Sequence, residues 1–69
     1  EISVDAGGRY FLKGEESGNK AVVAFLKGFE KNTAVLIQAD GRAPHGRVLQ
    51  LLDLVKTQGF GRVAFVTRQ

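Results

Sequence analysis

Residues 33–67 have the sequence TAVLIQADGRAPHGRVLQLLDLVKTQGFGRVAFVT, which predicts a strand, a helix and a second strand. The apolar run at residues 33–37 is typical of a strand that is covered on both faces. A helix is expected from Pro44 to Gln58, because apolar residues recur there at the spacing of one helical face. These residues are Val48, Leu51, Leu52 and Val55. Residues 62–67 are the expected second strand, and a helix of this length joins parallel strands by a right-handed crossover.

The N-terminal part of the chain predicts a hairpin. Residues 2–5 alternate apolar and polar side chains, which is the period of a half-buried strand. Gly7 and Gly8 indicate a turn, because glycine accepts the positive φ angles of tight turns. Residues 9–12 return as a strand rich in aromatic residues. Residues 13–19 contain two glycines, two glutamates and a serine, and are expected to form a loop.

A first helix is expected over residues 20–31, again from one apolar stripe. The stripe contains Val22, Phe25, Leu26 and Phe29. Asn19 is expected to cap this helix, since its side-chain oxygen accepts a free backbone N–H of the first turn. In the second helix, Pro44 suits the first helical position, where its missing N–H costs nothing. Gly59 suits the position just after the helix.

Together these elements predict an α+β fold of two layers with the order β-β-α-β-α-β. Two helices on one face of a mixed four-stranded sheet bury both apolar stripes at once. The other sheet face is expected to be only partly polar, because Phe11, Val35, Ile37 and Phe65 or the Val63–Val66 pair cannot all point toward the helices. An open apolar face or edge favours a binding partner.

Length and charge narrow the class of protein. The chain has 69 residues, enough for one domain, and a net charge of +3. Its ten lysines and arginines are scattered along the chain, which is typical of a solvated surface and does not favour nucleic-acid binding. The longest apolar run, residues 21–26, is far shorter than the roughly 18 residues of a membrane-spanning helix. Because the sequence starts at Glu1, directly before a strand, we expect it to be part of a longer protein.

The sequence favours a binding role over catalysis. The chain has no cysteine and one histidine, His45, so neither a metal site nor a cofactor is expected. Residues 41–48 imitate the glycine spacing of a phosphate-binding P-loop, but Arg47 replaces its lysine and Val48 its serine or threonine. Asp40 has no second carboxylate nearby in the sequence, and no nucleophile stands beside a base. We therefore expect that the protein is not an enzyme.

The order of motifs in residues 35–67 resembles the periplasmic domain of the ExbD/TolR family of biopolymer transport proteins. In that family a strand ends in Ala-Asp, a proline opens a helix that contains an aspartate, and a glycine precedes the last strand. Here Ala39-Asp40, Pro44, Asp53 and Gly59 occupy those places. The expected hairpin of residues 2–12 matches the family's opening, so the resemblance covers nearly the whole chain. His45 departs from the pattern, since the family usually has an aromatic residue there, and the stretch before the first helix is shorter.

The resemblance implies a bacterial inner-membrane protein with one N-terminal membrane helix and with residues 1–69 as a single periplasmic domain. It implies work beside an ExbB-type channel protein, in which proton motive force moves a TonB-type protein during outer-membrane transport. This domain would dimerise and engage TonB or, in the TolR branch, peptidoglycan. The sequence Ala-Asp-Gly at residues 39–41 slightly favours the ExbD branch.

The last strand is the expected partner-binding surface, because an exposed strand edge accepts an extended segment by β-augmentation. The expected contacts are Val63, Phe65, Val66 and Thr67, with a polar rim of Arg42, Pro44 and His45. Two alternatives remain open from the residues alone, a small RNA-binding module and a regulatory domain that binds a small ligand. Salt-dependent retention on a polyanion is typical of the first, and a saturable thermal shift with a metabolite is typical of the second.

Overall fold

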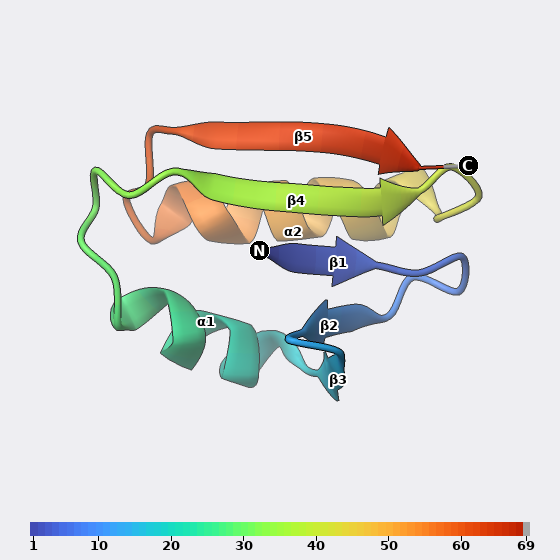
Figure 1. Ribbon diagram of the computed structural model, residues 1–69, viewed down its shortest axis with the longest axis horizontal. Coiled ribbons are helices and arrows are strands. Elements are labelled where there is room, and N and C mark those ends of the chain that lie inside the picture. Colours follow the sequence, from blue (N-terminus) through green and yellow to red (C-terminus); the bar gives the residue numbers. More distant parts are fainter. Residues whose placement is uncertain (69) are drawn as a thin grey trace.

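The computed structural model describes residues 1–68, which form a five-stranded mixed sheet and two helices (Figure 1). In chain order the elements are β1 (Ile2–Val4), β2 (Tyr10–Leu12), β3 (Glu15–Ser17), α1 (Asn19–Lys27), β4 (Val35–Asp40), α2 (His45–Thr57) and β5 (Val63–Arg68). The strand order across the sheet is β3-β2-β1-β4-β5. The expected α+β class is therefore confirmed, and the sheet has one strand more than expected.

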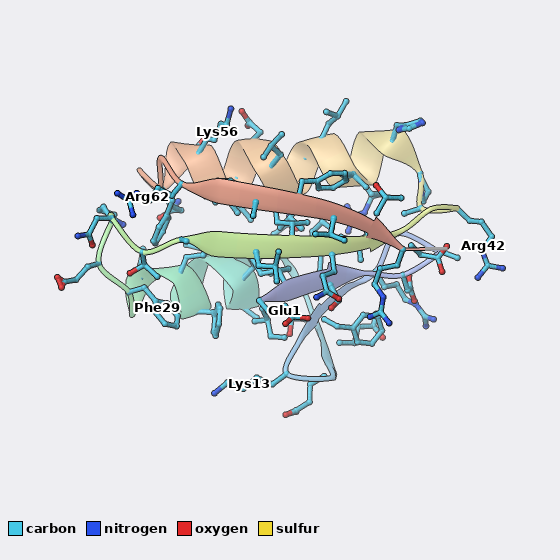
Figure 2. The ribbon with its side chains drawn as sticks, turned by 45° about the horizontal axis from the view of Figure 1, so that its top comes forward. Glu1, Lys13, Phe29, Arg42, Lys56 and Arg62 are labelled. Carbon is cyan, nitrogen blue, oxygen red and sulfur yellow. The ribbon has the colours of Figure 1, made fainter. Side chains whose placement is uncertain are left out.

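The β4-α2-β5 segment forms the predicted crossover. Strands β4 and β5 run parallel, and Ile37 pairs with Phe65. Strand β1 is parallel to β4 on its other side, and β2 returns antiparallel to β1. Both helices lie behind the sheet in Figure 2. Along β4 buried and half-buried residues alternate, so one face of the strand points toward the helices.

The core lies between the sheet and the two helices. Its buried side chains are Ile2, Val4, Tyr10, Val22, Leu26, Val35, Ile37, Ala39, Ala43, Leu51, Val55 and Phe60. The predicted stripes supply two residues from each helix, Val22 and Leu26 in α1 and Leu51 and Val55 in α2. Tyr10 is buried with its hydroxyl satisfied, because this group donates a hydrogen bond of 2.7 Å to the carbonyl oxygen of Arg47.

Strand β3 corrects the expectation of a loop at residues 13–19. Lys13 and Gly14 form the turn between β2 and β3, with positive φ angles of 53° and 83°. Two consecutive positive φ angles are the mark of a type I′ hairpin turn, whose twist matches the flanking strands. Strand β3 escaped prediction because it is a polar edge strand whose residues lie largely in solvent, so it shows no apolar alternation.

Helix α1 ends four residues earlier than the apolar stripe predicted, because the expected helix ran to residue 31. It ends at Lys27, and Gly28 is its C-cap. Phe29 consequently lies beyond the helix, 44% exposed, with its ring edge-to-face against Phe25. The expected cap at Asn19 was also wrong, because Asn19 is the first helical residue and Gly18 precedes it without a side-chain cap.

The ends of the other elements were close to the prediction. Pro44 is the residue before α2, with an extended ψ of 131°, and the helix begins at His45. Gly59 follows the helix with φ +97°, which confirms its expected position. Strand β4 starts two residues later than expected and continues to Asp40, because β5 runs beside it over its whole length.

Candidate partner-binding site

Strand β5 is the free edge of the sheet next to α2. Within residues 1–68 it pairs with β4 alone, and five of its six residues are exposed. The backbone N–H of Val35 donates to the carbonyl oxygen of Arg62 at 2.9 Å, and the N–H of Gly41 donates to that of Arg68. Because the backbone groups of successive residues alternate in direction, the even-numbered residues of β5 face β4. The N–H and C=O groups of the odd-numbered residues, 63, 65 and 67, therefore point outward along the edge.

An apolar groove runs between β5 and α2. Its volume is about 280 Å³, and it is lined by His45, Val48, Leu49, Leu52 and Phe65. Phe65 is 49% exposed and Leu49 is 62% exposed. Large apolar side chains gathered on one exposed surface are unusual in a small domain. These two line one groove beside β5, where the backbone N–H and C=O groups of residues 63, 65 and 67 have no partner among the described strands of the sheet. The groove and the edge thus form one continuous surface.

The structure brings together only some of the residues expected at this surface. Phe65 and His45 line the same groove, although 20 positions separate them in the sequence. Val63 and Thr67 share the face of Phe65, since their strand partners Val35 and Ala39 are buried toward the helices. Val66 points to the opposite face of the sheet, beside Gln38, and is 45% exposed there.

The expected polar rim is only partly available. Arg42 lies at the end of β4, where its backbone N–H and its Nε donate to Asp40 Oδ1 at 2.8 and 3.0 Å. The Arg42 guanidinium and these hydrogen bonds lower the pKa of Asp40 to about 2, and the carboxylate raises the pKa of Arg42. Arg42 is thus engaged within its own turn. Pro44 is exposed just before α2, one residue from the groove.

Sequence reasoning missed Leu49 as a site residue and treated Val48 and Leu52 only as members of a buried stripe. The sequence did contain one signal: Leu49 is a large apolar residue that lies outside the stripe of Val48, Leu51, Leu52 and Val55. An apolar residue off the buried face of a helix is a candidate contact.

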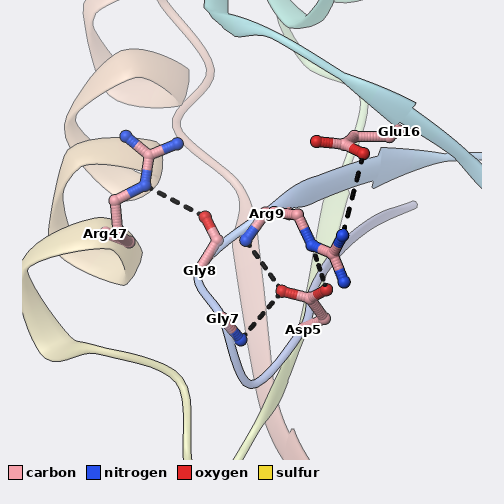
Figure 3. Close-up of polar contacts among 6 residues, drawn as sticks. All are labelled: Asp5, Gly7, Gly8, Arg9, Glu16 and Arg47. Carbon is pink, nitrogen blue, oxygen red and sulfur yellow. Dashed lines mark hydrogen bonds and ion pairs between the residues drawn. The ribbon is translucent and has the colours of Figure 1, made fainter.

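A hydrogen-bonded clamp fixes the start of α2 against the β1–β2 hairpin. Arg47 Nε donates to the carbonyl oxygen of Gly8 at 3.0 Å (Figure 3). The same guanidinium lies over the Tyr10 ring at 4.5 Å. Within the hairpin, Asp5 accepts hydrogen bonds from the N–H groups of Gly7 and Arg9 and from Arg9 Nε, and these contacts lower the pKa of its carboxyl. The clamp positions His45 and Val48, which form one wall of the groove.

Gly8 offers a test of this clamp. Its φ is +84°, and a Cβ at this position would lie 2.8 Å from Cγ of Arg47. We expect Gly8→Ala to lower the free energy of unfolding by about 1–2 kcal/mol, because an L-residue is strained at this φ and the clamp must shift. The matched control is Gly46→Ala, where the added Cβ meets open space on α2 and where alanine is the better helix former by up to about 1 kcal/mol. Equal urea midpoints for the two variants would contradict a close contact at Gly8.

A second groove lies on the sheet face opposite the helices, with a volume of about 260 Å³. It is lined by Ser3, Val4, Asp5, Phe11, Gln38, Asp40 and Arg68. Arg68 donates a hydrogen bond of 3.1 Å to Gln38 Oε1 across the strands. Phe11 and Gln38 lie in one cross-strand row, since both are paired with Ser3. This surface is polar with one aromatic residue, whereas the groove beside β5 is apolar.

Comparison with known proteins identifies the family of the chain. Within residues 1–68 no helix has the length and apolar character to cross a membrane, and no three potential ligands group around a possible metal site. None of the curated proteins matches the sequence significantly. The family model described as biopolymer transport protein ExbD/TolR matches residues 1–69, the full sequence. The chain therefore belongs to the ExbD/TolR family of biopolymer transport proteins.

Proposed function

We propose that this domain is the periplasmic recognition element of an energy-transduction complex and that it captures an extended segment of a TonB-type protein at β5. Proteins of the family are anchored in the bacterial inner membrane and belong to biopolymer transport complexes. One observation carries the proposal: the outward backbone groups of Val63, Phe65 and Thr67 lie beside the apolar groove of α2. Backbone hydrogen bonds supply affinity in such a complex, and the groove supplies specificity.

The proposed role is recognition and not catalysis. A membrane segment outside this chain would join the domain to an ExbB-type channel protein, and proton flow there would move the captured partner. The captured strand would transmit that movement well. A pull along the strand loads all its backbone hydrogen bonds to β5 at the same time, so they must break together before the partner is released. The ExbD branch fits this role, since it is the branch that engages TonB.

The polar groove on the opposite sheet face supports a second candidate, the peptidoglycan binding of the TolR branch. Ser3, Gln38 and Arg68 offer hydrogen-bonding groups beside the ring of Phe11. A few polar groups placed around an aromatic side chain are typical of a site that orients a polar ligand such as a saccharide. The two candidates use opposite faces of the sheet, so one experiment separates them.

Amide NMR of the chain, titrated with the periplasmic region of a TonB protein, tests the proposal. We expect saturable shifts at residues 63–67 and at Leu49, with Ser3 and Phe11 unchanged. A parallel titration with soluble peptidoglycan fragments is the comparison, and shifts at Ser3, Phe11 and Gln38 there would favour the TolR role. Shifts from the TonB region that fall on α1 alone would remove the proposal of capture at β5.

A further inference from the structure

We infer that β5 selects a strand with apolar residues at alternate positions, a large apolar side chain opposite Phe65, and acidic residues toward its two ends. This inference rests on the proposed capture at β5 and adds the chemistry of the captured segment. Its basis is the register of β5, the groove beside Phe65 and the charges at the ends of the strand.

The register decides which side chains of an added strand meet α2. The added strand must bond to residues 63, 65 and 67, whose backbone groups point outward from the sheet. Directly opposed residues of neighbouring strands carry their side chains on the same face. Phe65 lies on the helix face and lines the groove. The residue opposite Phe65, and those two positions away on either side, therefore point toward α2.

The groove selects an apolar side chain at the central position. Four of its five lining residues are Val48, Leu49, Leu52 and Phe65, and His45 stands at the start of α2. Its volume of about 280 Å³ accommodates a leucine or an aromatic ring beside Phe65. A polar or charged side chain placed there would lose its hydration without gaining hydrogen bonds along the apolar wall.

The positive charges at the two ends of β5 favour a captured strand with negatively charged residues opposite them. Arg62 precedes β5 and Arg68 is its last residue; both are exposed, and within residues 1–68 neither forms an ion pair. The guanidinium of Arg68 donates one hydrogen bond, to Gln38 on β4, and keeps its positive charge uncompensated by any described carboxylate. The carboxylate nearest to Arg68 in register is Asp40, which Arg42 already engages. Figure 2 shows Lys56 and Arg62 toward one end of β5 and Arg42 toward the other end. An acidic residue opposite each flanking arginine forms a favourable cross-strand pair.

The same charges disfavour a second copy of the chain as the occupant. Antiparallel pairing of two β5 strands uses all three outward residues only when Phe65 faces Phe65. That register places Arg62 of each copy opposite Arg68 of the other, so two pairs of like charges meet directly. A partner strand with acidic flanks has no such repulsion.

The test uses the nine-residue peptide TEVTLTVET, which has the same sequence from either end and so does not depend on strand direction. Its central leucine faces Phe65, its valines face residues 63 and 67, and its glutamates face Arg62 and Arg68. We expect about tenfold weaker binding for TKVTLTVKT, from two reversed charge pairs, and for TEVTATVET, from the lost apolar contact. Titration calorimetry gives the Kd values, and amide shifts locate each peptide.

A charge-reversed chain with Arg62→Glu and Arg68→Glu is the matched control, and we expect it to prefer TKVTLTVKT. If all three peptides bind β5 equally, capture at the edge stands and the inferred chemistry is wrong. If none binds, or if the shifts fall away from β5, capture itself fails. Sedimentation that shows dimers of the chain, broken by Phe65→Asp, would make a second copy the occupant and overturn the inference.

Discussion

Leu51→Ala is expected to remove a large fraction of the free energy of unfolding of the protein. Leu51 is fully buried in α2, in the middle of the core. Removing such a leucine side chain costs about 2–5 kcal/mol, from lost burial and from the cavity that remains. A domain of 69 residues has a total stability of about 3–10 kcal/mol. The loss is thus a large fraction of the whole, and urea unfolding monitored by circular dichroism measures it.

Leu49→Ala is the matched control for this prediction. It makes the same substitution two positions earlier in the same helix, at a side chain that is 62% exposed. The change in helix propensity is identical, so the difference between the variants isolates burial. We expect Leu49→Ala to change the unfolding free energy by less than about 0.5 kcal/mol. Equal losses of unfolding free energy for the two variants would contradict the orientation of α2, in which Leu51 faces the sheet and Leu49 faces solvent.

The β-α-β half of the fold was predictable because its periodicities are strong. The apolar run in β4 and the stripe of α2 each point to one arrangement, and Gly59 marks the helix end by its positive φ. Helix α1 was harder to delimit, because Phe29 continues the stripe although Gly28 already ends the helix. Tertiary packing beyond the helix places Phe29 against Phe25, and local periodicity does not contain that information.

Strand β3 lay beyond sequence reasoning for a different reason. Its turn uses Lys13 at a positive φ, where asparagine, aspartate or glycine is the usual signal. Its residues are polar because both faces of this short edge strand meet solvent. Charged residues on an edge strand also protect the sheet from further pairing. The charges of β3 therefore disfavour pairing of another strand at that edge, whereas the mostly apolar β5 allows it.

The exposed edge strand of the candidate site was predictable from the sequence, but the groove beside it was not. An apolar last strand in the sequence predicts an exposed edge, and Phe65 lies there. Val66 was expected at the same surface as Phe65, but its side chain points to the opposite face of the sheet, because successive residues of a strand alternate between the two faces. The wall formed by Leu49 and Leu52 depends on how α2 crosses β5, which no local pattern specifies.

Thr67→Pro is expected to weaken partner binding at least tenfold while the fold remains intact. The N–H of residue 67 points outward from β5, so proline there removes a donor that the sheet does not use. The proline ring also occupies the space of an added strand. Proline is tolerated at edge positions whose N–H faces solvent. Each lost backbone hydrogen bond costs about 0.5–1.5 kcal/mol, and the steric conflict adds to it. Calorimetry with TEVTLTVET and with the periplasmic region of a TonB protein measures the loss.

Val66→Pro, one position earlier, is the control that distinguishes the outer edge of β5 from its hydrogen bonds to β4. The backbone N–H of residue 66 faces β4, so the substitution removes a hydrogen bond of the sheet itself. We expect it to destabilise the fold by about 1–3 kcal/mol, because the acceptor on β4 loses its partner. The two prolines should thus have opposite signatures: at residue 67 lost binding with an unchanged unfolding midpoint, at residue 66 a lowered midpoint. Binding by Thr67→Pro at the wild-type affinity would show that the partner does not use the backbone of this edge. The groove would then have to act alone, and Leu49→Ala, which is expected to leave the fold intact, would become the variant that abolishes binding.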